Sequence, residues 1–131
     1  MPIDDVVRDA RASLDRLEPI AAKRHIDAGA LLIDTRTEWQ RQEQGELPKA
    51  IVIDRTVLEW RLDPSCESHI PEIDGYDQMI VVVCRQGYSS SLAAQSLQRL
   101  GLKRATDIIG GVESWIHHGL PLSQLPADVR R

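Results

Sequence analysis

Residues 79–91 have the sequence MIVVVCRQGYSSS, in which an apolar run ends at a cysteine and a polar, hydroxyl-rich stretch follows. A continuous β-branched run is typical of a strand covered on both faces, the usual state of a strand in a parallel sheet. Residues 90–100 have helical character, and Gly101 is placed to end that helix. The stretch therefore predicts a buried strand, a tight loop that begins at Cys84, and a helix.

The rest of the chain repeats this alternation of strand and helix. Short apolar runs predict further strands at 31–34, 50–53 and 105–109. Periodicity predicts helices over 3–17, where Asp4 or Asp5 is the expected cap, from Pro19 to Gly29, and over 112–118. Two capping boxes, TEWQ (37–40) and TVLE (56–59), each predict the start of a further helix. We therefore expect an α/β fold with a central parallel sheet flanked by helices on both faces. No repeat or linker divides it, so we expect one domain, with residues 1–17 as a helix packed on residues 18–131.

Composition narrows the classes of function. The 131 residues carry a formal net charge of −4, with 42% hydrophobic and 27% charged residues. Acidic and basic residues are mixed along the chain, which argues against nucleic acid or an anionic membrane as the main partner. No apolar run approaches the roughly 20 residues that span a bilayer, and the charged, periodic N-terminus does not resemble a secretory signal. Two cysteines, Cys66 and Cys84, make a poor disulfide framework, so we expect a reducing, cytoplasmic location.

Cys84 has two interpretations at this stage. A free cysteine is often a small buried apolar residue. Alternatively, it is a nucleophile, since a thiol with an ordinary pKa of about 8.5 ionises more readily at a helix start. Gly87 allows the loop to curl its N–H groups around an anion, Arg85 adds a fixed charge, and one of the serines at 89–91 is expected to cap the helix. The combination favours the catalytic interpretation.

Four blocks of the sequence together resemble the rhodanese family of sulfurtransferases. They are LIDTR (32–36), GELPKA (45–50), VVVCRQGYSS (81–90) and GGVESWIHHGLP (110–121), in the family's order and spacing over roughly residues 18–122. The stretch LEWRLDP (58–64) also resembles small single-domain members from actinobacteria. The resemblance implies a rhodanese-like sandwich.

The resemblance also implies a mechanism and a set of site residues. Cys84 would take a sulfane sulfur from a donor such as thiosulfate, hold it as a persulfide, and pass it to cyanide, a small thiol or a protein thiol. The persulfide would lie in the loop formed by Arg85, Gln86, Gly87, Tyr88 and Ser89. Asp34, Arg36 and Ser90 would support that loop. No cofactor or metal is implied, and the physiological donor and acceptor stay open.

Two positions depart from the family pattern. Glu46 stands where the family usually has histidine, which can change the geometry of its loop or donor access. Tyr88 stands where many members carry a second basic residue, so Arg85 is the only formal charge in the loop. We therefore expect modest activity with thiosulfate.

Other interpretations are weaker. A phosphatase of the same superfamily would have arginine at the sixth place after the cysteine, where this chain has Ser90. A module that only binds a partner or carries a persulfide commonly loses the cysteine, which is present here. Cys66 could resolve a persulfide but has no charge pattern of its own, and adjacent His117 and His118 cannot share a metal ion on one helix face. Of the tryptophans at 39, 60 and 115, Trp60 has the best chance of lining the site.

Overall fold

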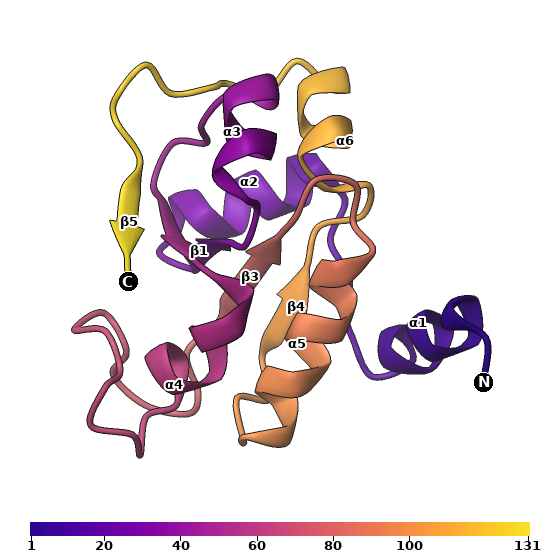
Figure 1. Cartoon of the computed structure of the whole chain (residues 1–131), viewed down its shortest axis with the longest axis vertical. Helices are drawn as coiled ribbons and strands as arrows, with labels where there is room; N and C mark the ends of the chain where they lie inside the picture. Colours follow the sequence, from indigo (N-terminus) through magenta and orange to yellow (C-terminus); the bar gives the residue numbers. More distant parts are fainter.

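A five-stranded sheet in which every strand pair is parallel lies at the centre of the computed structural model, which describes residues 1–131 (Figure 1). The strand order is β4-β3-β1-β2-β5. The strands are β1 (Leu31–Asp34), β2 (Ala50–Ile53), β3 (Ile80–Val83), β4 (Ala105–Asp107) and β5 (Asp128–Arg130). The predicted α/β class with a central parallel sheet is confirmed.

Helices cover both faces of the sheet. They are α1 (Ile3–Arg11), α2 (Pro19–Asp27), α3 (Glu38–Gln44), α4 (Leu58–Leu62), α5 (Ser89–Arg99) and α6 (Gly111–His117), with a short 3-10 turn at Arg55–Val57. Alternate residues of β3 point to opposite faces, as the pleat requires: Ile80 and Val82 pack with α4 and α5, whereas Val81 and Val83 pack with α2 and α6. No helix of the structure combines the length and the apolar character needed to cross a membrane.

The register of the sheet brings three strand ends together. Asp34 at the end of β1 lies beside Val83 of β3, and Val82 lies beside Asp107 at the end of β4. Because parallel strands end at the same edge, the loop that begins at Cys84 lies between two carboxylates that are far apart in the sequence.

Several helix starts differ from the predictions. The box at 37–40 caps α3, with the Thr37 hydroxyl and the Gln40 side chain bonding reciprocally. The box at 56–59 does not form, because the Asp54 side chain caps the 3-10 turn instead. The first helix ends at Arg11 rather than at residue 17, and it begins after Pro2 without a side-chain cap.

The last strand, β5, was not predicted. It pairs with β2 at the edge of the sheet, and its residue Arg130 donates two hydrogen bonds to the Glu72 carboxylate, at 3.0 and 2.7 Å. These bonds hold the pKa of Glu72 below its ordinary value of 4.5, against the opposing effect of burial. The carboxylate form of Glu72 therefore contributes stability above pH 4.5, which is lost as the pH falls through the lowered pKa.

We predict that Glu72→Gln lowers the free energy of unfolding at pH 7 by about 0.5–1 kcal/mol, the size of a partly exposed ion pair. Urea unfolding at pH 7 and in steps below pH 4.5 measures the unfolding free energy of both proteins. The difference between variant and wild type is expected to disappear as Glu72 becomes protonated. Glu67→Gln, in the same connecting loop but without an ion pair, is the control. A gap that persists at low pH would contradict the prediction.

Candidate active site

Cys84 lies directly after β3, and its thiol is enclosed by the loop that it begins. Its Sγ accepts hydrogen bonds from the backbone N–H groups of Gly87, at 3.1 Å, and Ser90, at 3.4 Å. The residue is 5% exposed, and it borders a pocket of about 220 Å³. N–H donors aimed at a sulfur favour its negative charge, so the loop is built to hold an anion at this position.

Four further N–H groups of the loop are unpaired. Those of Arg85, Gln86, Tyr88 and Ser89 have no hydrogen-bond acceptor within the chain. In contrast, loop carbonyl groups bond outward: that of Cys84 accepts from Val112 N at 2.9 Å, and that of Arg85 accepts from Glu113 N at 3.1 Å. The start of α6 thus turns loop carbonyls away from the thiol.

Two glycines permit this close packing. Gly87 has a φ of +87°, and Gly111 has a φ of +62°. A Cβ on Gly111 would lie 2.5 Å from the carbonyl oxygen of Cys84 and 2.7 Å from the nitrogen of Gly87. Since this space is filled by backbone, a larger residue at 111 would displace the loop itself.

The predicted supporting pair, Asp34 and Arg36, forms a fully buried ion pair. Arg36 donates from Nε and Nη2 to the Asp34 carboxylate, at 3.0 and 2.8 Å. Its Nη1 donates to the Gln44 side chain at 3.4 Å, and Gln44 in turn donates to the carbonyl of Arg85 at 3.5 Å. The end of β1 is therefore connected to the loop through Gln44.

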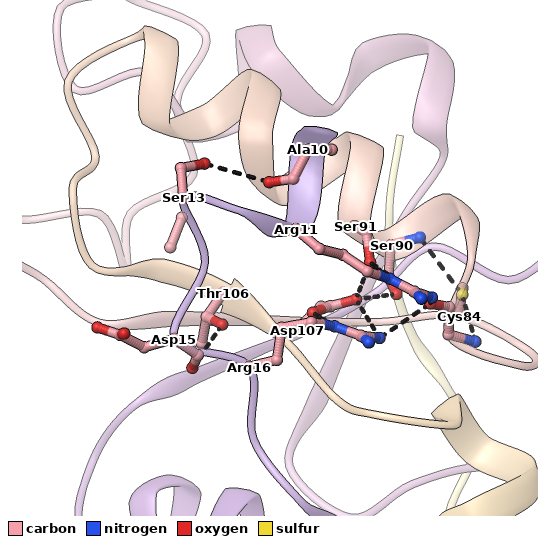
Figure 2. A network of polar contacts seen from close by, with 12 residues as sticks. Ala10, Arg11, Ser13, Asp15, Arg16, Cys84, Ser90, Ser91, Thr106 and Asp107 are labelled. Atoms are coloured by element: carbon pink, nitrogen blue, oxygen red, sulfur yellow. Dashed lines mark hydrogen bonds and ion pairs between the residues drawn. The ribbon is translucent and has the colours of Figure 1, made fainter. Parts of the chain in front are cut away.

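A second buried carboxylate, Asp107, was missed by the sequence analysis. Figure 2 shows the hydroxyl groups of Ser90 and Ser91 directed at it, and both donate to Asp107 Oδ2 at 2.8 Å. Neither serine caps α5 as expected; its N-cap residue is Tyr88, which makes no side-chain cap bond. Arg16 completes the cluster with bonds of 2.8 and 3.2 Å to the same carboxylate. The sequence feature that could have identified Asp107 is its charge within the otherwise apolar run at 105–109.

One aromatic side chain lines the pocket, and a second contacts a residue of its loop. Tyr88 lines it and is 59% exposed, and the Arg11 guanidinium lies 5.5 Å from the centre of its ring. Arg85 lies 5.6 Å from the Trp39 ring and 3.9 Å, Nη2 to Oε1, from Glu43. Trp39, rather than Trp60, is the tryptophan beside the site; Trp60 is exposed and borders no pocket near Cys84.

Three other residues considered in the sequence lie outside the pocket that contains Cys84. Glu46 forms an ion pair with Arg41 at 2.7 Å. Cys66 lies in the connection between α4 and β3 and lines neither pocket that borders the loop. His117 lines the neighbouring pocket against Tyr88 and belongs to no cluster of metal-ligating groups.

Comparisons with known proteins place the chain in a family. Residues 18–118 match the model of the rhodanese-like domain family. A sulfurtransferase of Allochromatium vinosum is 33% identical over 92 residues, which cover 70% of this chain and 77% of that protein. The adenylyltransferase and sulfurtransferase UBA4 of Candida albicans is 37% identical over 114 residues, 87% of this chain but 24% of that protein, so the chain spans about a quarter of this relative.

A solved structure is similar over nearly the whole length. It is a protein of Rhodopseudomonas palustris described as a "possible tyrosine phosphatase", with a TM-score of 0.84 and 27% identity, covering 94% of this chain and 95% of that one. The part of this chain that is similar to that structure is therefore longer than residues 18–118, and it includes most of the segment before residue 18.

We predict that Gly111→Ala destabilises the fold and slows alkylation of Cys84, because the new Cβ collides with the loop backbone. Gly119→Ala is the matched control: Gly119 has a φ of +70° and nothing within 4 Å of the added Cβ. The control is expected to cost about 1–2 kcal/mol of unfolding free energy from the left-handed backbone alone, with normal alkylation. Urea unfolding and iodoacetamide kinetics measure both; equal effects of the two variants would contradict the collision.

Proposed function

Since this chain belongs to the rhodanese-like domain family, we propose that it is a sulfurtransferase that carries a sulfane sulfur as a persulfide on Cys84. The supporting observation is the loop around that thiol, in which two N–H groups bond Sγ and four more have no acceptor within the chain. The four free donors suit a second sulfur that bears negative charge.

The proposed reaction has two displacement steps with no net oxidation. The Cys84 thiolate attacks the outer sulfur of the donor, forming a new S–S bond. The donor's own bond to that sulfur breaks, and its electron pair leaves on sulfite when the donor is thiosulfate, or on a thiolate when the donor is a persulfide. An acceptor, cyanide or a thiolate, then attacks the outer sulfur, and the electron pair of the broken bond returns to Cys84.

The environment of Arg85 supports a donor less charged than thiosulfate. Arg85 is the only formal cation in the loop, and it lies against the Trp39 ring and near the Glu43 carboxylate. Both contacts draw the guanidinium toward α3, and Glu43 offsets its charge. A low-molecular-weight persulfide, or a persulfide on another protein, is therefore the proposed donor class, with thiosulfate as a slow substrate.

Two alternatives have specific support. The R. palustris protein is described as a "possible tyrosine phosphatase", but here the sixth residue after Cys84 is Ser90, whose hydroxyl bonds Asp107 instead of reaching a ligand. The second alternative is a module that binds a partner or carries persulfide without turnover, for which exposed Trp39 and Tyr88 would form the contact surface. A sulfur adduct on Cys84 would exclude the phosphatase, and repeated turnover of a donor would exclude a module that only carries persulfide.

We predict that incubation with thiosulfate or glutathione persulfide adds one sulfur atom, about 32 Da, to the intact protein. Cyanide is expected to remove it and release thiocyanate. Cys84→Ser should gain nothing, whereas Cys66→Ser should behave as wild type. No adduct with any donor would refute the proposal, and phosphatase activity toward an aryl phosphate would then favour the first alternative.

We also predict that Glu43→Gln raises the second-order rate constant with thiosulfate about two- to fivefold, the size of an exposed ion-pair term. The rate with glutathione persulfide should change less, since its reacting persulfide group carries at most one negative charge whereas thiosulfate carries two. Glu38→Gln makes the same charge change on the same helix without an ion pair to Arg85 and is the control. An equal gain from both variants would indicate a general effect of net charge.

A further inference from the structure

Two arginines before the family-matched region reach the back of the Cys84 loop. Arg11, at the end of α1, donates from Nη2 to the carbonyl of Gly87 at 2.8 Å, and Arg16 donates from Nη2 to the same oxygen at 3.0 Å. Figure 2 shows both arginine side chains beside Asp107 and Ser91. Both precede residue 18, where the family match begins. This contact therefore comes from the part of the chain that the family model does not include.

Both guanidinium groups are held in place by other bonds. Arg16 forms an ion pair with Asp107, whose side chain is fully buried. Arg11 donates from Nε to the Ser91 hydroxyl at 3.1 Å, and Ser91 donates to Asp107. Two arginines and one carboxylate leave one net positive charge directly behind the loop.

The direction of these bonds determines where a loop N–H group points. In a planar trans peptide the C=O and the N–H point in opposite directions. Since the carbonyl of Gly87 is bonded to the arginines, the N–H of Tyr88 in the same peptide faces away from them, and it has no acceptor within the chain. Tyr88 lines the pocket that contains Cys84. Charge-assisted bonds to the carbonyl also polarise this peptide and make its N–H a stronger donor.

We propose that Arg11 and Arg16 are positioning residues, which hold the Gly87–Tyr88 peptide with its N–H toward the anion on Cys84 and add positive charge behind it. The proposal rests on the role of Cys84 as the nucleophile. It assigns the segment before residue 18 a part in the reactivity of the site, beyond packing against α5.

The other charged or titratable groups around the loop come from five elements. They are Arg85 and Tyr88 of the loop, Asp107 of β4, the Asp34–Arg36 pair at the end of β1, Glu43 of α3, and Glu113 and His117 of α6. The test leaves all of them unchanged and alters only the N-terminal arginines.

The test is the rate of Cys84 alkylation by iodoacetamide at pH 7 and pH 10, in a Cys66→Ser background. For Arg11→Gln we expect about a three- to tenfold lower rate at pH 7, smaller than the effect of a cation in direct contact with the thiolate. At pH 10, where an ordinary thiol with pKa of about 8.5 is mostly ionised, the rate should match that of the parent. Arg11→Lys should recover part of the loss because it keeps the charge.

Controls separate positioning from folding. Arg8→Gln removes a charge from the same helix at a side chain that is 76% exposed, and it should leave both rates unchanged.

Arg16→Lys is the second test variant. It keeps a cation beside buried Asp107, so it is preferred to a neutral replacement, and it should also slow alkylation at pH 7. Thermal unfolding of each variant verifies that it is folded.

Each outcome bears on the proposal. Unchanged rates in folded Arg11→Gln and Arg16→Lys, or a fall of equal size at pH 7 and pH 10, would overturn it. Persulfide formation is measured separately by intact mass. A normal sulfur adduct with no effect of the arginines would refute the positioning role alone, whereas a pH-dependent effect without any adduct would refute sulfur transfer alone.

Discussion

The outward direction of the loop carbonyl groups is the constraint on which the rest of the site depends. In the loop after β3, the carbonyls of Cys84 and Arg85 bond the start of α6, and that of Gly87 bonds two arginines. A peptide whose carbonyl is held outward must direct its N–H inward. The N–H groups of Gly87 and Ser90 already bond the thiol sulfur, so little reorganisation of these two donors is needed when charge develops there.

Two buried ion pairs support the loop from opposite sides. Asp34 pairs with Arg36 at the end of β1, and Asp107 pairs with Arg16 beside the end of β4. Each carboxylate is fully buried, and an unpaired charge at such a site would be costly. Because the parallel register places both strand ends next to β3, these pairs fix the loop at the same edge of the sheet without entering the pocket.

The electrostatics of the pocket differ between its front and its back. At the front, Arg85 is drawn toward Trp39 and Glu43, and its charge is partly offset. Behind the loop, Arg11 and Arg16 outnumber Asp107. The positive charge of Arg11 and Arg16 lies behind the loop backbone and is not offset fully by Asp107. Such a site suits an anion bound covalently to the protein better than a free dianion from solution.

The sequence by itself determined the class of fold, and it predicted Cys84 as the location of the chemistry. The apolar run 79–83 followed by Cys84 and Gly87 has local signals strong enough to predict a strand, an anion-holding loop and a helix, and Asp34 and Arg36 were found because they match a short motif. The structure alone revealed the contacts of Asp107, Arg11 and Arg16. The arginines bond Gly87 and Asp107 across 71 to 91 residues of the chain, and the serines that bond Asp107 lie 16 and 17 residues before it. The structure also replaced the expected serine cap with buried serine–Asp107 bonds and added the short edge strand β5, whose side chains are mostly exposed and carry no apolar pattern. Local propensity and periodicity act over a few residues, whereas only the register of the sheet decides which distant charges meet.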